Sequence, residues 1–257
     1  MALYLGIDVG SVATKGVLLD GDGGEHSHVV SSGFDYGAAA RRMRDELLEM
    51  SGVSAEDVDG LVLTGCGAGN AMLQGREASE IVCCARGIQS VFPSVRTVLN
   101  VGGQSSQALR LGDNGKVADF VFSERCAAGS ARFLQVMANV LRVKLEDIGP
   151  LSLKATNPVS FSTGCAVFGE TEAITRIAEG FSKEDILAGV HQSLTSKLAS
   201  LVARVTLTED CALCGGGALD VGLVKTVEST LGVKVLVPPK PQVVTALGAA
   251  VMARDAA

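Results

Sequence analysis

A glycine-turn hairpin that occurs twice constrains the fold of this chain more than any other feature. The segment GIDVGSVATKGVLL at residues 6–19 aligns without gaps, at an offset of 92 residues, with LNVGGQSSQALRL at residues 99–111. One position changes in charge, because Asp8 of the first copy aligns with Asn100 of the second. The repeat predicts two halves built on related βββ-α units, whose glycine loops face one another across a cleft.

The composition agrees with a two-part α/β protein. With 257 residues the chain can hold one large domain or two small ones. It is 47% hydrophobic and contains 31 glycines and no Trp, which suits an α/β protein with many tight strand-to-helix turns. We expect a first subdomain of residues 1–96 plus 240–257 and a second of residues 97–239, without a Pro- or Ser-rich linker.

Charge and hydropathy argue against two classes of partner. The formal net charge of −6 argues against nucleic acid, which requires a basic stripe. No segment approaches twenty uncharged apolar residues, so we expect no membrane span. The start MALYLGIDVG lacks the basic flank of a signal peptide, and we therefore expect a cytoplasmic protein.

Apolar spacing predicts where the helices and strands lie. Residues 3–8 suit a buried strand that leads into a hairpin through a DGDGG turn. Segments 157–180 and 210–231 each suit a strand, a tight turn and a helix. The other predicted helices cover residues 36–52, 77–92, 127–141, 184–205 and 245–257, and a short strand covers 233–237.

Both hairpin turns carry residue types that bind phosphate. Glycines let backbone N–H groups approach phosphate oxygens, hydroxyls add donors and a lysine adds a cation. Asp8, at the end of a buried strand, can hold Mg²⁺ through water. One copy also fits an ordinary hairpin, whereas two copies favour phosphate binding. The candidates are Gly10, Ser11, Thr14 and Lys15 in the first turn, and Gly102, Gly103, Ser105 and Ser106 in the second.

A third glycine run, CGGGALDVG at residues 214–222, follows a predicted strand and opens a predicted helix. Gly215, Gly216 and Gly217 can lie flat against an adenosine because their backbone is accessible, with Asp220 near the ribose. Taken alone, the run also fits a plain turn between a strand and a helix. Its position after the two hairpins favours the nucleotide interpretation.

Two cysteines stand where helices are expected to begin, Cys126 in SERCAAGSARFLQV and Cys165 in STGCAVFGETEAI. The helix macrodipole lowers the pKa of a thiol at such a position. Two thiolates are too few for a [4Fe–4S] cluster, which takes four, but a two-fold dimer would supply the other two. Two ordinary buried cysteines are the alternative. The other five, Cys66, Cys83, Cys84, Cys211 and Cys214, are expected to pack in the core.

With these motifs the chain resembles the ATPase activators of 2-hydroxyacyl-CoA dehydratases (component A), which are related to the ATPase subunits of benzoyl-CoA reductase. The resemblance covers nearly the whole chain, and CAAGSARFL and GCAVFGETE are its most distinctive blocks. It implies the actin-like ATPase fold of acetate and sugar kinases, Hsp70 and actin. It also implies a homodimer that binds ATP or ADP with Mg²⁺ and holds one [4Fe–4S] cluster through Cys126 and Cys165 of each subunit.

The resemblance further implies a reaction. The cluster would accept one electron from ferredoxin or flavodoxin. ATP binding and hydrolysis would then move helices at the cluster and drive the electron into a dehydratase partner. From the residues themselves we assign Asp8 and Asn100 to the metal side of the nucleotide, and Gln104 to the positioning of the attacking water.

The second loop departs from the family pattern, which reads DIGGQD followed by SK. Here it reads NVGGQS at residues 100–105, followed by SQ, so two carboxylates and one lysine are missing. Asn100 can still orient a Mg²⁺-bound water, but it lacks the charge that would hold the ion strongly. We therefore expect slower turnover or a different target, and we expect the substitution Asn100→Asp to raise turnover.

Three other functions stay open at this point. An ATPase subunit of a benzoyl-CoA-reductase-like or other low-potential reductase would tolerate a weakened loop in an asymmetric heterodimer. A small-molecule kinase of the same fold would need a carboxylate base, which the second loop does not offer. A nucleotide-binding regulator would bind ATP without hydrolysing it.

Overall fold

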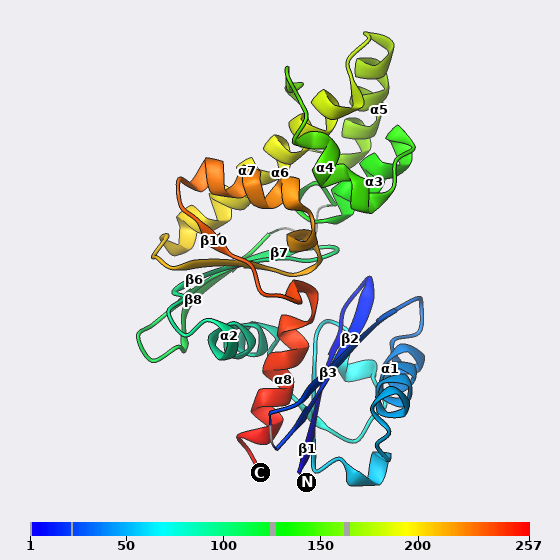
Figure 1. Ribbon diagram of the computed structural model, residues 1–257, viewed down its shortest axis with the longest axis vertical. Coiled ribbons are helices and arrows are strands. Elements are labelled where there is room, and N and C mark those ends of the chain that lie inside the picture. Colours follow the sequence, from blue (N-terminus) through cyan, green and yellow to red (C-terminus); the bar gives the residue numbers. More distant parts are fainter. Residues whose placement is uncertain (1, 22, 124–126, 162–164) are drawn as a thin grey trace. The chain divides into compact units, whose positions relative to one another are not determined.

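Two five-stranded sheets with the same strand order form the framework of the chain. The computed structural model describes residues 2–21, 23–123, 127–161 and 165–257. The first sheet has the order β3-β2-β1-β4-β5, and the second has the order β10-β9-β6-β7-β8, which is the same order read from the other edge. In each sheet the central strand pairs antiparallel with the next strand and parallel with a later one. The duplication that the hairpin repeat predicts is therefore present in the fold (Figure 1).

The chain divides into two units, each with its own sheet. Unit 1 comprises Met1–Arg96, Leu111–Ala118 and Pro238–Ala257, and unit 2 comprises Thr97–Arg110 and Asp119–Val237. The strands are β1 (Leu3–Val9), β2 (Ala13–Asp20), β3 (Glu25–Ser31), β4 (Gly60–Thr64), β5 (Arg76–Glu77), β6 (Thr97–Val101), β7 (Ser106–Leu111), β8 (Val117–Phe122), β9 (Cys211–Cys214) and β10 (Val235–Leu236). The helices are α1 (Tyr36–Ser51), α2 (Glu80–Val91), α3 (Arg132–Leu141), α4 (Ile148–Ser152), α5 (Ala166–Ala178), α6 (Lys183–Val205), α7 (Val221–Leu231) and α8 (Val244–Arg254). Short 3₁₀ helices are η1 (Ala55–Asp57), η2 (Ala68–Asn70), η3 (Ala127–Gly129), η4 (Leu145–Asp147), η5 (Gly216–Leu219) and η6 (Pro241–Val243).

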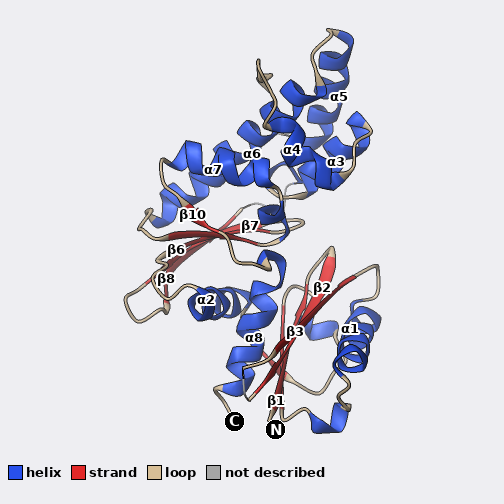
Figure 2. Ribbon diagram, viewed as in Figure 1, coloured by secondary structure: helices blue, strands red, loops and turns tan. Residues whose placement is uncertain are grey.

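Because side chains alternate along β1, the two faces of the sheet in unit 1 pack against different helices. Leu5 and Ile7 pack with Met43 and Leu47 of α1 in one apolar cluster. Gly6, between them, faces the opposite way and lies against the backbone of α8. Figure 2 shows α1 on one face of this sheet and α2 and α8 on the other. Both faces of β1 are thus buried, which explains why its residues read as a nearly continuous apolar run.

Helices α2 and α8 approach closely because glycines lie at their contact. A Cβ at Gly248 of α8 would collide with the carbonyl of Cys83 and lie 2.7 Å from the backbone nitrogen of Gly87 in α2. A Cβ at Gly87 would collide in turn with the carbonyl oxygen of Val244. The atoms in the way are backbone atoms, so the helices themselves would have to separate.

We expect Gly248→Ala to lower the free energy of unfolding by about 3 kcal/mol, because overpacking of this contact cannot be relieved by a rotamer change. Denaturant unfolding followed by circular dichroism measures the effect. Gly69→Ala is the matched control, because a Cβ there would meet only Glu77 Oε1, at 3.9 Å. Equal unfolding midpoints for the two variants would contradict the packing argument.

Helix α6 is the central helix of unit 2. It contacts α3, α4, α5 and α7 as well as η3 and β6. Its inward side carries fully buried Ile186, Leu187, Val190 and Leu194, which belong to the large apolar cluster of this unit. Movement of α6 would therefore affect most elements of unit 2.

The predicted elements are largely present, with four differences. The helix expected from residue 77 begins only at Glu80, because residues 76–77 form β5 beside β4. The helix expected from residue 127 begins as η3 and continues as α3 only from Arg132, and α4 has no counterpart in the prediction. The strand expected just before Cys165 is wrong for residues 157–161, which form no strand; the backbone N–H of Asn157 donates to Asp185 of α6 instead. Within the described ranges, every helix is too short or too polar to cross a bilayer.

Candidate functional site

The first predicted phosphate turn joins β1 to β2. Asp8 is the penultimate residue of β1 and is the register partner of Lys15 in β2. Lys15 Nζ lies 2.9 Å from Asp8 Oδ2, and the Asp8 side chain is 8% exposed. A Cβ at Gly10 would lie 2.8 Å from the carbonyl oxygen of Ala13 and 2.7 Å from this ammonium group, so the turn fits a glycine best. A carboxylate and a cation thus lie together at the end of a buried strand, an arrangement that suits Mg²⁺ and phosphate oxygens.

Ser11 and Thr14 differ in their accessibility. Ser11 is half-buried in the turn, whereas Thr14 is fully buried and its hydroxyl lies 2.9 Å from Ser32 Oγ. Ser32 Oγ also donates to the carbonyl oxygen of Gly10 at 2.5 Å. Thr14 therefore supports the turn from its buried side. Phosphate contacts of Ser11 and Thr14 stay predictions.

The second turn repeats this geometry without its charges. Asn100 of β6 and Gln107 of β7 are register partners and occupy the positions that Asp8 and Lys15 occupy in the first sheet. Asn100 is 7% exposed and Gln107 is 2% exposed. The carboxylate at this position and the cation opposite it are therefore absent together. One physical reason is that either charge alone would be buried without a counter-charge.

The loop of the second turn is hydrogen-bonded to the segment that follows Cys126. The backbone N–H of Ala131 donates to the carbonyl oxygen of Gly102 at 2.9 Å. The Ser130 hydroxyl, which is fully buried, lies between two carbonyl oxygens to which it can donate, at 3.3 Å from that of Gly103 and 3.1 Å from that of Ala127. Cys126 itself lies outside the described residues. The predicted phosphate loop therefore contacts this segment directly, through the backbone of Ala131 and the hydroxyl of Ser130.

The remaining residues of this turn lie at different depths. Gln104 is exposed at the tip, so its side chain is free to reach a ligand, and Ser105 is half-buried. Ser106 is fully buried, and its hydroxyl donates to the carbonyl oxygen of Gly129 at 2.7 Å. Gln104 is thus accessible enough to position a water, as predicted for it. Ser106 instead makes a hydrogen bond inside the protein.

Matching glycine turns follow β4 and β9. Gly65 has φ 89° and Gly215 has φ 82°, in the region that favours glycine. A Cβ at Gly65 would collide with Asp8 Oδ1, and a Cβ at Gly215 would collide with Asn100 Oδ1. Gly65 was absent from the predicted site residues, although the shared G-x-G-A spacing at 65–68 and 215–218 signals it.

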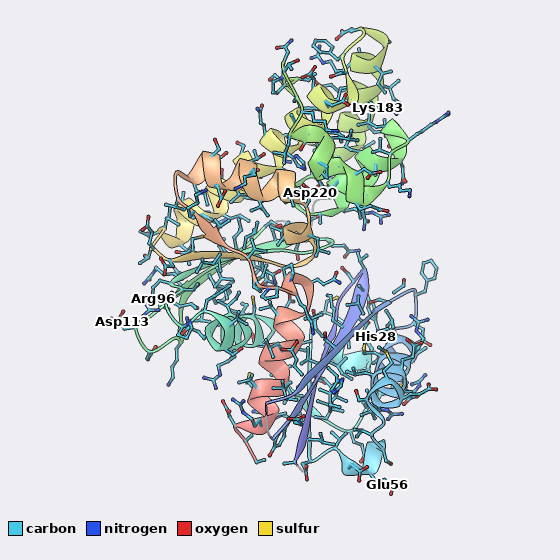
Figure 3. All side chains as sticks on the ribbon, viewed as in Figure 1. His28, Glu56, Arg96, Asp113, Lys183 and Asp220 are labelled. Atoms are coloured by element: carbon cyan, nitrogen blue, oxygen red, sulfur yellow. The ribbon has the colours of Figure 1, made fainter. Side chains whose placement is uncertain are left out.

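The rest of the third glycine run leads into α7. Gly216 is exposed with open space around it, and Gly217 is buried against the side chain of Val101. Asp220 is the N-cap of α7, and its Oδ1 accepts the backbone N–H of Leu223 at 2.9 Å. Figure 3 labels Asp220 in unit 2; its side chain is 8% exposed and lies 3.2 Å from His191. A contact of Asp220 with a ribose stays a prediction.

Cys165 is the N-cap of α5, as the sequence predicts, and is partly exposed. Hydrogen bonds from the backbone N–H groups of Phe168 and Val167 lower the pKa of its thiol. This environment favours the thiolate, the form that binds metal. Among the described residues, no three His, Cys, Asp or Glu side chains gather as a metal site. A cluster would thus need Cys126 or a second subunit in addition to Cys165.

The other cysteines lie in the core, as predicted, with one exception. Cys83, Cys84, Cys211 and Cys214 are buried, and burial raises the pKa of Cys83 to about 11 and that of Cys211 to about 12. The prediction for Cys66 is wrong, because this residue is exposed. It lies in the glycine turn after β4, which carries it out of the sheet. Partial burial of its sulfur raises the pKa of its thiol all the same.

The pKa values of the two accessible thiols are therefore shifted in opposite directions, that of Cys165 downward and that of Cys66 upward. We expect alkylation by iodoacetamide to begin at lower pH for Cys165 than for Cys66, because the thiolate is the nucleophile. Peptide mass spectrometry of iron-free protein, alkylated over a range of pH, measures both rates in one sample. An earlier onset for Cys66 would contradict the stabilisation of the Cys165 thiolate by the start of α5.

Comparison with known proteins gives three findings. The model of the BadF/BadG/BcrA/BcrD ATPase family matches residues 5–253. The chain is 40% identical over 254 residues to the activator of lactoyl-CoA dehydratase from Anaerotignum propionicum, covering 98% of both chains. The solved structure of the 2-hydroxyisocaproyl-CoA dehydratase activator from Clostridium difficile with bound ADPNP superimposes with a TM-score of 0.94 at 35% identity, covering 99% of this chain and 95% of that one.

A more distant structure bears on the fold alone. A ROK family glucokinase from Streptomyces griseus has a TM-score of 0.62 at 12% identity, and the match covers 99% of this chain and 100% of the glucokinase. The predicted α/β fold of the ATPase and sugar-kinase class is thereby confirmed, as is the resemblance to the dehydratase activators.

Proposed function

We propose that this chain, which belongs to the BadF/BadG/BcrA/BcrD ATPase family, is an activator that couples ATP hydrolysis to one-electron transfer. Its partner is an enzyme of the 2-hydroxyacyl-CoA dehydratase type. The proposal includes a cytoplasmic homodimer, a [4Fe–4S] cluster shared by the two subunits, and ferredoxin or flavodoxin as electron donor. The 40% identity to a lactoyl-CoA dehydratase activator supports it.

The residues of the first turn are assigned to the nucleotide and its metal ion. Asp8 would hold Mg²⁺ through water, with Lys15 at 2.9 Å keeping the carboxylate oriented and adding a positive charge for phosphate. Ser11 and the backbone N–H groups around Gly10 would donate to phosphate oxygens. Because Asn100 is neutral, Asp8 would carry most of the carboxylate charge that the metal requires.

The residues of the second turn are assigned to phosphate and water. Gly102 and Gly103 would offer backbone N–H groups, and the exposed Gln104 would orient the water that attacks the terminal phosphate. The contacts of this loop with Ser130 and Ala131 are the observation that carries the proposal. A displacement of the loop by phosphate would be passed directly to the residues after Cys126.

Cys165 fits the role of a cluster ligand. It is partly exposed, and the N–H groups of Val167 and Phe168 stabilise the thiolate that iron binding needs. With Cys126, and with the same pair from a second subunit, the protein would supply the four thiolates of a [4Fe–4S] cluster. When bound, the cluster supplies the electron that leaves for the partner enzyme.

Metal analysis of anaerobically purified protein, together with an ATPase assay, tests this function. We expect about four iron atoms and as many acid-labile sulfides per dimer, and ATP hydrolysis that requires Mg²⁺. Little or no iron after careful reconstitution would exclude electron transfer and leave a kinase or a nucleotide-binding regulator.

The neutral Asn100–Gln107 pair favours one second candidate. In a low-potential reductase with two different ATPase chains, one chain can keep a weakened loop while the other hydrolyses ATP. The observation that favours it is the absence of both charges that the first turn keeps. Co-purification with a second ATPase chain of different sequence would select this candidate.

The pairing also changes what we expect of Asn100→Asp. Alone, this substitution places a buried carboxylate opposite Gln107, and we expect it to lower the free energy of unfolding by about 2 kcal/mol without raising turnover. The double variant Asn100→Asp, Gln107→Lys restores the arrangement of the first turn, and its turnover and stability should both exceed those of the single variant. Thermal unfolding and steady-state ATPase assays measure both. Faster turnover of the single variant than of the double variant would show that Gln107 is not the relevant partner.

A further inference from the structure

A buried polar cluster lies where α4, α6 and α7 meet. The three helices contact one another pairwise. His191 of α6 is fully buried, and its Nε2 lies 3.2 Å from Oδ1 of Asp220, the N-cap of α7. A Cβ at Gly149 of α4 would lie 2.7 Å from the same Oδ1, and a Cβ at Gly222 would collide with Ser152. Glycines on two helices thus enclose the histidine and the aspartate.

The polar atoms of this cluster are incompletely satisfied. Both ring nitrogens of His191 and Oδ2 of Asp220 are buried and have no hydrogen-bond partner among the described residues. The 3.2 Å contact between His191 and Asp220 therefore lacks the alignment of a hydrogen bond. Unpartnered polar groups in a packed interior cost free energy, so an arrangement that aligns this pair would be favoured.

Asp220 connects the cluster to the third glycine run. Its backbone N–H donates to the carbonyl oxygen of Gly217 at 3.2 Å, and its side chain caps α7 at Leu223. A ligand that contacts the Gly215–Gly217 turn would thus shift the Asp220 carboxylate relative to α6. His191 is the α6 residue that this carboxylate faces.

Helix α6 connects the cluster to the segment that leads to Cys165. Two residues before His191, a Cβ at Gly189 would collide with the carbonyl oxygen of Val159. One turn earlier, the Asp185 carboxylate accepts the backbone N–H groups of Thr156 at 2.9 Å and Asn157 at 2.7 Å. Asp185, Gly189 and His191 span about 9 Å of helix. Residues 156–161 therefore pack against the same part of α6 that contains His191.

We propose that His191 is a positioning residue that transmits nucleotide occupancy of the Gly215–Gly217 turn to the segment before Cys165, through its contact with Asp220. This inference rests on the proposed function, because it requires that the turn binds a nucleotide. It describes a route distinct from the loop contacts with Ser130 and Ala131, which lead to Cys126. With two routes, one nucleotide could act both on the segment after Cys126 and on the segment before Cys165.

Hydrogen exchange measured by mass spectrometry tests this inference without iron. The readout is exchange in peptides covering residues 155–161, with and without ADP and Mg²⁺, while calorimetry on the same sample measures ADP affinity. We expect ADP to change the exchange rate by about fivefold in the wild type. His191→Gln and Asp220→Asn should each largely abolish this change. Asp220→Asn keeps a residue that caps a helix and removes the charge that faces His191. Because Asp220 is also a predicted ribose contact, the comparison is made at ADP concentrations that calorimetry shows to saturate both proteins.

The controls separate transmission from simple destabilisation. Thr195→Val changes a buried hydroxyl one helical turn beyond His191 and should leave the ADP-dependent change intact. The double variant His191→Gln, Asp220→Asn should lose no more of the change than either single variant, because the two side chains act as a pair. A merely structural role for His191 would alter exchange equally with and without ADP.

Each other outcome has a definite meaning. If His191→Gln binds ADP and shows the wild-type change in exchange, the inference is overturned. It is also overturned if the wild type binds ADP and residues 155–161 do not respond, while the proposed function still stands. If calorimetry detects no ADP binding to the wild type, the proposed function itself fails.

Discussion

Replacing Cys165 by serine is expected to reduce the iron content from about four atoms per dimer to below one. In the proposed two-fold cluster this position would supply two ligands, one from each subunit, so a single substitution would remove half of the thiolates. Cys165 is the N-cap of α5, and its thiolate is stabilised by the N–H groups of Val167 and Phe168. A serine hydroxyl in the same place stays protonated and is a poor ligand for iron.

The measurement is iron and acid-labile sulfide in anaerobically purified protein, with electron transfer to an artificial acceptor as a second readout. Cys66→Ser is the matched control, because Cys66 is the other accessible thiol among the described residues. It should keep its iron. ATP hydrolysis without the cluster should persist in Cys165→Ser, since the predicted nucleotide residues are unchanged. Full iron content in Cys165→Ser would show that Cys165 is not a ligand of the cluster.

The second large effect is expected at the first phosphate turn. Asp8→Asn should lower ATP turnover by about 100-fold, because it removes the carboxylate that we propose orients water around Mg²⁺. The variant also leaves Lys15, 2.9 Å away, without its counter-charge. Raising the Mg²⁺ concentration should recover part of the lost turnover, because the metal would still bind weakly through phosphate.

Steady-state ATPase assays over a range of Mg²⁺ concentrations measure this effect, and thermal unfolding checks that the variant is folded. Asp113→Asn is the control. Asp113 is exposed, it lies 3.7 Å from Arg96, and Figure 3 labels both residues. A surface pair of this kind contributes little, so turnover should not change. Unaltered turnover in Asp8→Asn would show that the metal ion is held elsewhere.

Much of the fold could be predicted because its signals are local. The glycine turns and apolar runs of the two hairpins predict two sheets of the same kind, and the structure has them. The helix expected to end at Gly52 does so, with φ 68° at that residue. Cys165 stands at a helix start because small residues follow a polar segment there. Each of these depends on residues that are neighbours in the chain.

The errors arose where non-local contacts override local pattern. Residues 157–161 read as a strand, but their backbone is held by Asp185 of α6. Cys66 reads as a core residue, but the turn after β4 is held to β1 by the hydrogen bond from Gly67 N–H to the Val9 carbonyl oxygen, and Cys66 is exposed there. No periodicity in one segment contains the information that another segment will occupy its hydrogen bonds.

The sequence by itself determined the repeated hairpins, the glycine turns and the cysteine at a helix start, because turn chemistry and apolar periodicity act between neighbouring residues. Only the tertiary structure decided which side chains face each other. It made Asn100 and Gln107 cross-strand partners, the neutral counterpart of Asp8 and Lys15, and it enclosed His191 against Asp220. Such pairs depend on strand register and helix packing, which arise only when distant segments bury their surfaces together.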